Sequence, residues 1–378
     1  MDARDLCAVG DALAEGFDGT TRQIKEVHEA VADRSFRLAG QAGGPAKAAH
    51  DTLARRVYAT LLRVGPAAIR SSALALGMAF DAEADRIEGS QRGRAVVSAF
   101  NGVFGDALAR RHNGLALRMS VRADGHDIPA DPHSLAQAFP KATPKLALFV
   151  HGFGETDASW RWFAEASWGD ATITYGEKLR RERGYTPLYL HYNSGRTIAE
   201  NAAELSELLE DIQAAWPAPV RETIVIGHSA GGLIARAAIR HGNLAGARWV
   251  RSTSHVLALG TPRHAIAAEW LSLAFARLLE RLPETRPLAR LLDARSDGLK
   301  DLGDNDSGPL PPWVADVRLP KRAPRVGHFK LLNHPAVYAQ ISARLSDHSV
   351  PFPARAARGG RYERAAKALR APKQSQRR

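Results

Sequence analysis

Short, almost purely apolar runs recur along the middle of the chain and are separated by longer mixed segments. The runs are residues 146–150, 188–192, 223–226 and 255–259. Continuous apolar runs are typical of strands that are covered on both faces, as in a parallel sheet. The intervening segments 198–215 and 233–241 have helical spacing. Strands that alternate with helices predict βαβ units with right-handed crossovers, running from about residue 115 to 348.

The two ends of the chain have a different texture. Residues 3–112 are rich in Ala, Leu and Arg and predict helices, with breaks at 43–45 (Gly-Gly-Pro) and at Gly65-Pro66. This part carries no catalytic pattern. It fits a helical cap or extension, or a surface that docks on lipid or a partner. After it, residues 115–121 alternate as in a half-buried strand, and Asp124-Gly125 suits a hairpin turn.

Length and composition agree with this division. With 378 residues, 45% of them apolar and 24% charged, the chain has enough apolar sequence for a sizeable core. We predict a helical N-terminal extension (1–112), an α/β domain (113–348) and a basic, loosely structured tail (349–378).

The net charge of +12 belongs largely to the tail. Residues 354–378 hold nine basic residues and one acid, which is +8, so the remaining 353 residues carry about +4. With only Tyr362 as an aromatic among these charges, the composition disfavours nucleic-acid binding as their role. Attraction to an anionic membrane surface, at about 1 kcal/mol per basic residue, explains such a segment at least as well.

Cysteine usage and the N-terminus bear on location. The single Cys7 excludes an intrachain disulfide, and the first ten residues, MDARDLCAVG, lack the basic and apolar pattern of a signal peptide. The most apolar early stretch, 57–80, is interrupted by two arginines and a proline, which disfavours a membrane span. We expect a cytoplasmic protein, with peripheral attachment to the membrane as the alternative.

The strongest chemical signal is Gly227-His-Ser-Ala-Gly231, which directly follows an apolar strand and directly precedes a helix. Gly-x-Ser-x-Gly in this context predicts a nucleophile elbow, a tight turn that lifts the Ser229 hydroxyl clear of the sheet. The N–H of Ala230 then follows the nucleophile and can donate to an oxyanion.

A second signal is the run 146–154, an apolar strand that ends in His151-Gly-Phe-Gly154. Glycines after such a strand let the backbone approach a substrate carbonyl, and the Phe153 N–H is the expected second oxyanion donor. His151, Gly152 and His228 flank these positions, so we expect them to line the substrate site.

A serine nucleophile needs an imidazole as its general base, in the chain order serine, acid, histidine. Of the later histidines (His255, His264, His328 and His334), His328 stands in a glycine-containing loop before a final amphipathic helix and is the predicted base. His334 precedes a proline at the start of that helix, where a capping role is more natural. The acid is less defined: Asp306 is favoured, then Asp304, among candidates that also include Asp297, Asp301 and Asp316.

These segments together resemble a known family. Residues 149–156, 188–196, 227–232, 259–262, 282–288 and 327–335 are similar to bacterial α/β-hydrolases of the lipase/esterase-like group, distantly similar to GPI inositol-deacylases. The resemblance implies an α/β-hydrolase fold with Ser229 and His328 as nucleophile and base, and Phe153 and Ala230 in the oxyanion hole. The chain departs from it at Arg263-His264-Ala265, where the family has a histidine and soon a glycine, and in the short interval of 25 residues between Leu302 and His328.

We therefore expect a hydrolase of lipid or other acyl esters that forms an acyl-enzyme and needs no metal or organic cofactor. Thioester hydrolysis or acyl transfer would use the same residues. A binding protein whose hydrolase fold has lost its acid is the remaining alternative.

Overall fold

The computed structural model describes residues 3–38, 44–79, 91–261, 313–317 and 327–346. The chain divides into two compact units, residues 1–97 with 108–116 and residues 98–107 with 117–378. The predicted domain boundaries at 112/113 and 348/349 stay predictions, and the basic tail and the candidates Asp304 and Asp306 lie outside the described residues. Among the described helices none is long and apolar enough to cross a bilayer.

The first unit contains two long helices, α1 (Ala3–Leu38) and α2 (Gly44–Ala79), which pack against each other. α3 (Gln91–Arg110) follows and is divided between the two units. The expected break at Gly65-Pro66 is wrong, because α2 continues through Pro66. The Phe17 ring of α1 lies directly against the Gly65 backbone, so close packing between the helices supports the turn that proline weakens.

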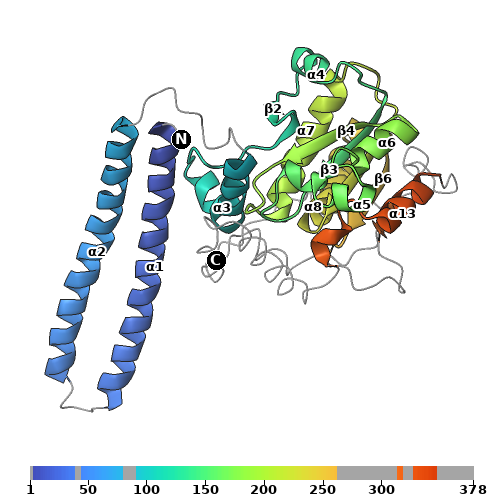
Figure 1. The fold of residues 1–378 in the computed structure, drawn as a ribbon. Coiled ribbons are helices and arrows are strands. Elements are labelled where there is room, and N and C mark those ends of the chain that lie inside the picture. The colour runs from blue at the N-terminus through green and yellow to red at the C-terminus, as the bar shows by residue number, and fades with distance from the viewer. Residues whose placement is uncertain (1–2, 39–43, 80–90, 262–312, 318–326, 347–378) are drawn as a thin grey trace, which may run out of the picture. The chain divides into compact units, whose positions relative to one another are not determined.

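The second unit is built on a seven-stranded sheet in the order β2-β1-β4-β3-β5-β6-β7 (Figure 1). Its strands are β1 (Ser120–Ala123), β2 (His126–Ile128), β3 (Lys145–Val150), β4 (Thr186–His191), β5 (Glu222–His228), β6 (Thr253–Leu259) and β7 (Val314–Val317). β1 runs antiparallel to β2 and β4, and the other pairs are parallel. The helices are α4 (Pro132–Ala138), α5 (Ala164–Trp168), α6 (Tyr175–Arg183), α7 (Ile198–Ala215), α8 (Ala230–Ala245), α9 (Arg248–Ser252) and α13 (Pro335–Ser346), with the 3₁₀ turns η3 (Asp157–Arg161) and η4 (His328–Leu331).

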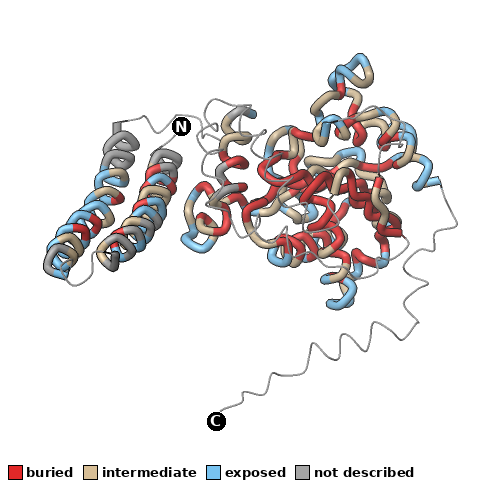
Figure 2. The backbone as a smooth tube through the Cα atoms, turned by 90° about the horizontal axis from the view of Figure 1, so that it is seen from below, coloured by how far each residue is buried: buried red, intermediate tan, exposed pale blue. Residues whose placement is uncertain are grey.

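Alternate side chains of the central strands pack into two separate hydrophobic cores, one on each face of the sheet. On β3, Leu146 and Leu148 pack with α7 and α8, whereas Ala147 and Phe149 face the side covered by α6, η3 and α13. Both faces of the sheet are therefore buried, as the continuous apolar runs predict. Figure 2 shows the buried residues gathered in the interior of the unit that contains the sheet.

Two expectations about strands need correction. The first strand begins at Ser120 and not at Leu115, because the Leu115 and Leu117 N–H groups donate to the side chains of Asn113 and Asn101. The turn at Asp124-Gly125 is confirmed. β7, which carries Asp316, was not expected at all.

The register brings the carboxyl ends of three parallel strands into line. Val150 of β3 pairs with Gly227 of β5, and His228 pairs with Leu259 of β6. The segments that follow these strands are the predicted oxyanion loop, the elbow and the Gly260-Thr261 turn. They therefore emerge side by side at one edge of the sheet, where open α/β sheets place their sites.

Candidate active site

Ser229 lies at the sharp junction between β5 and α8. Its backbone has φ 54° and ψ −122°, a strained combination for a residue with a side chain. The Ser229 N–H donates to the Leu259 carbonyl at 2.9 Å, and the Ser229 carbonyl accepts from the Thr261 hydroxyl at 2.9 Å. The end of β6 and the turn that follows it thus hold the strained residue at both of its backbone polar groups.

Glycines allow the close contacts of this turn. A Cβ on Gly227 would lie 2.5 Å from the Gly231 carbonyl carbon and from the Gly232 backbone. A Cβ on Gly231 would overlap the carbonyl oxygens of Val150 and His151, which end β3 and begin the next loop. Both outer positions of Gly-x-Ser-x-Gly therefore lack room for a side chain.

The predicted oxyanion loop lies directly against the elbow. A Cβ on Gly152 would be 3.1 Å from the Ser229 Cβ. The Gly154 N–H donates to the Ser194 hydroxyl at 2.9 Å, which fixes the loop beyond Phe153. The structure thus brings Phe153 and Ala230 onto neighbouring segments that meet at Ser229, whereas their roles as oxyanion donors stay a prediction.

The predicted base lies beside the turn that follows β6. His328 begins η4, and a Cβ on Gly260 would lie 3.1 Å from its Nδ1. The backbone of Ser229 is bonded to Leu259 and Thr261, and His328 lies beside Gly260 between them, so both predicted catalytic residues adjoin residues 259–261 at the end of β6. The two residues are 99 positions apart in sequence, and the fold brings them to one place.

The loop that carries His328 is fixed by its neighbour Asn333. Asn333 is buried with φ 61°, its side-chain oxygen accepts from the Tyr175 N–H at 2.8 Å, and its amide donates to the Trp160 and Trp162 carbonyls. His334 accepts from the Ala336 N–H at the start of α13, which agrees with the expected capping role. The sequence pattern did not single out Asn333.

Burial sets the electrostatics of the two histidines beside the elbow. It lowers the pKa of His328 to about 3, with His228 acting in the same direction and the negative charge of Glu155 opposing it. Burial likewise lowers the pKa of His151 to about 4. Both imidazoles are therefore neutral at neutral pH.

The side chains expected to line the substrate site are engaged by the protein itself. His151 is fully buried, its Nδ1 lies 2.8 Å from the Gly152 carbonyl oxygen, and its ring stacks on Tyr192 at 4.4 Å. His228 is also fully buried, and its Nδ1 lies 2.9 Å from a carboxylate oxygen of Glu155. Sequence reasoning missed Glu155. The sequence signal that could have found it is an acidic residue directly after the glycine loop that follows β3.

One of the candidate acids can be placed. Asp316 lies on β7 and forms an ion pair with the buried Arg236 of α8. Its carboxylate is thus committed to α8. Asp297, Asp301, Asp304 and Asp306 lie outside the described residues.

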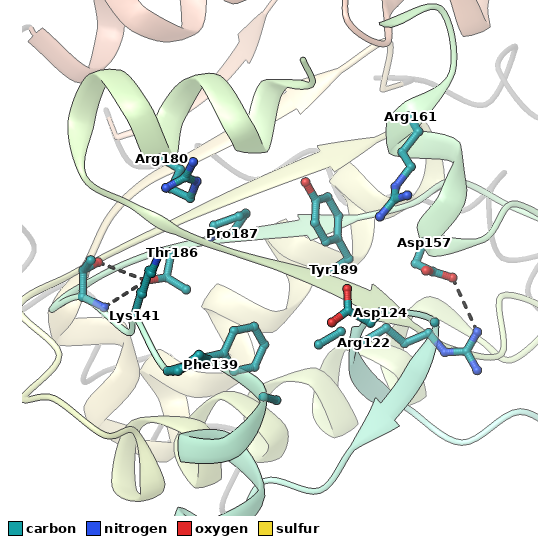
Figure 3. Close-up of a pocket in the computed structure, with 15 residues that line it drawn as sticks. Arg122, Asp124, Phe139, Lys141, Asp157, Arg161, Arg180, Thr186, Pro187 and Tyr189 are labelled. Atoms are coloured by element: carbon teal, nitrogen blue, oxygen red, sulfur yellow. Dashed lines mark hydrogen bonds and ion pairs between the residues drawn. The ribbon is translucent and has the colours of Figure 1, made fainter. Parts of the chain in front are cut away.

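A cavity of about 750 Å³ lies elsewhere on the second unit (Figure 3). It is lined from β1, β4, η3, α6 and the segment before β3, and Ser229 and His328 are not among its described lining residues. Four basic side chains face it, and one of them, Arg122, reaches Asp157 at 3.6 Å. This charged cavity is therefore distinct from the elbow.

Fold and comparisons agree on the class. The mostly parallel sheet with helices on both faces, together with the match of part of the chain to a family model, gives an α/β-hydrolase-like fold, as the sequence resemblance predicted. The matching family model is the PGAP1-like alpha/beta domain, over residues 145–295, less than half of the chain.

Two solved structures of the Bacillus licheniformis lipase BlEst2, in mature and propeptide form, are also similar. Each is 20% identical over 49% of this chain with a TM-score of 0.29, and the match spans 60% and 32% of their chains. The chain thus covers less than two thirds of either. No curated protein matches the chain.

Proposed function

We propose that the protein is a serine hydrolase that cleaves carboxylic esters, of lipids or other acyl compounds, through an acyl-enzyme. The observation that carries the proposal is the strained backbone of Ser229 between β5 and α8, beside the turn that His328 also adjoins. Strain of this kind costs of order 1–3 kcal/mol and is typical of functional sites. A structural turn would relieve it with a glycine at the same position.

The reaction follows from these positions. The Ser229 hydroxyl oxygen attacks the ester carbonyl carbon while His328 accepts its proton. The N–H groups of Phe153 and Ala230 donate to the resulting oxyanion. The alcohol leaves with the proton from His328. Water that His328 deprotonates then attacks the acyl-enzyme, and the carboxylic acid is released as the Ser229 hydroxyl is restored.

The electrostatics bear on the protonation state of the predicted base. A base must be neutral to accept a proton, and burial lowers the pKa of His328 to about 3, so its ring is neutral at neutral pH. Ser229 is 2% exposed, so a polar interaction there acts in a water-poor environment and is stronger than in solution. For the acid that orients His328 we propose Asp306, then Asp304, while Asp316 is committed to Arg236.

The experiment is a series of p-nitrophenyl esters of increasing acyl length, with thioester analogues, on the full chain and on Ser229→Ala. We expect ester turnover that falls by at least about 10³-fold in Ser229→Ala, since the nucleophile acts as a unit with its base. Faster turnover of thioesters than of matched esters would favour the thioesterase alternative. Equal ester turnover by both proteins would refute the proposal.

We further propose that the basic tail, 349–378, attracts the enzyme to anionic membrane surfaces where its acyl substrates lie. Full-length protein is expected to sediment with phosphatidylserine-containing vesicles and to be released by salt. A chain that ends at Pro351 and sediments equally well would contradict this role.

A further inference from the structure

Glu155 is an ionic group buried immediately beside the elbow. The residue is 2% exposed, and both carboxylate oxygens accept hydrogen bonds: Oε2 from the Gly152 N–H at 2.9 Å and Oε1 from the His228 ring at 2.9 Å. Its own N–H donates to the Gly152 carbonyl at 3.2 Å, and its carbonyl accepts from the Ser98 hydroxyl. Glu155 is thus tied to the glycine loop through both its backbone and its side chain.

The carboxyl group is charged despite its burial. Burial raises the pKa of Glu155, but the charge and hydrogen bond of His228 and the Gly152 N–H outweigh it and lower the pKa to about 2. A buried carboxylate is seldom the most stable way to fill a core, because the charged group loses its hydration. The buried charge of Glu155 therefore calls for an explanation other than packing.

His228 extends the contacts of Glu155 to the predicted base. A carboxylate can only accept, so the Nδ1 of His228 carries the hydrogen. On its other side the His228 ring packs on the His328 ring with centroids 4.6 Å apart, and its Nε2 lies 3.4 Å from the His328 carbonyl oxygen. The Glu155 side chain thus contacts the glycine loop directly, and it is linked to the His328 loop through the ring of His228.

We propose that Glu155 is a positioning residue for the reaction at Ser229: it fixes the oxyanion loop at Gly152, holds His228 against His328, and places a negative charge near the imidazolium that His328 becomes. This inference rests on the proposed function. A conventional triad acid orients its histidine by direct hydrogen bonding and stabilises the charged ring. Glu155 contributes the same two effects through His228, from the side of β3.

Two variants separate the charge from the contacts. Glu155→Gln removes the charge but keeps an oxygen for the Gly152 N–H, and its NH₂ can pair with the other tautomer of His228. His228→Asn retains an amide donor near the position of Nδ1, so Glu155 stays bonded, and removes the part of the ring that contacts His328. Glu222→Gln is the matched control: Glu222 begins the strand that His228 ends, and its carboxylate accepts from Tyr185 and Ser254.

The measurement is kcat and KM on a short p-nitrophenyl ester, with active sites counted by fluorophosphonate labelling, so that kcat refers to folded, competent sites. We expect Glu155→Gln and His228→Asn each to lower kcat by about 10- to 100-fold, equivalent to about 1.4–2.7 kcal/mol, with KM within about threefold. The double variant should have a kcat no lower than that of the more impaired single variant, since both substitutions break the same connection between Glu155 and His328. Glu222→Gln should stay within about twofold of wild type.

Wild-type kcat per labelled site in both single variants would overturn the inference, because it would leave Glu155 with a structural role only. Should Glu155→Gln yield no folded protein, His228→Asn decides alone by the same criterion. Failure of the proposed function is distinguishable, since the wild-type protein itself would then show neither turnover nor labelling.

Discussion

Substituting Gly227 by alanine should separate the stability of the elbow from its activity. The added Cβ would lie 2.5 Å from backbone atoms of Gly231 and Gly232, which form the first turn of α8. No flexible side chain can give way there, so α8 and the strand must separate by about 0.9 Å to reach the 3.4 Å of ordinary contact. Ser229 and Ala230 lie within the segment that has to move.

The substitution should reduce activity far more than stability. Overpacking costs about 1–3 kcal/mol, but alanine is favoured over glycine within a strand by about 0.5–1 kcal/mol, so the net loss of stability is small. At about 2–4 °C per kcal/mol for a domain of this size, Tm should fall by no more than about 10 °C. A misplacement of about 1 Å at reacting groups can cost about 100-fold in rate, so kcat/KM should fall by that order.

The assay is ester hydrolysis beside thermal unfolding, at a temperature where the variant is folded. Gly327→Ala is the matched control, because a Cβ there meets nothing within 4 Å and the residue has φ −61°. It should leave both quantities unchanged or raise Tm slightly. If Gly227→Ala kept kcat/KM within about threefold of wild type, the account of the elbow would be refuted.

Two further outcomes follow from the same site. Because burial lowers the pKa of His328 to about 3, the base stays neutral on mild acidification. We therefore expect kcat/KM to stay constant within about twofold from pH 7 to pH 5. A decline in kcat/KM with a midpoint near pH 6.5 would instead show a histidine with an ordinary pKa. Asn333→Ala removes three hydrogen bonds that hold the His328 loop. It should lower the unfolding free energy by about 2–4 kcal/mol in denaturant titrations and reduce ester turnover. An unchanged denaturant midpoint of unfolding would contradict that role.

The sequence predicted those parts of the fold that follow from local patterns. β3, β5 and β6 are buried on both faces, so each appears as a continuous apolar run, and α7 has the predicted bounds of 198–215. β7 has only four residues, one of them Asp316, whose charge is balanced by Arg236 some 80 positions earlier. Because the two residues of this ion pair are so far apart in sequence, no local pattern indicates β7, and the sequence did not predict it.

The same limit applies to the site. Gly-x-Ser-x-Gly is visible because its chemistry lies within five consecutive residues. Glu155 and His228 are 73 positions apart and meet only because β3 and β5 pair with Val150 beside Gly227. His228 lies within the Gly-x-Ser-x-Gly pattern, but nothing in that pattern points to Glu155, so only the register of the sheet shows their contact.

The most direct test of the central claim is to map the adduct of a fluorophosphonate probe on the full-length protein by peptide mass spectrometry. The account predicts one phosphonyl group per chain, on Ser229, formed quickly in the wild type and absent from Ser229→Ala. It also predicts slow labelling when His328 is replaced by alanine, because the hydroxyl would lose its base. A folded wild-type protein that remains unlabelled, or that is labelled at another residue, would contradict the assignment of Ser229 as the nucleophile.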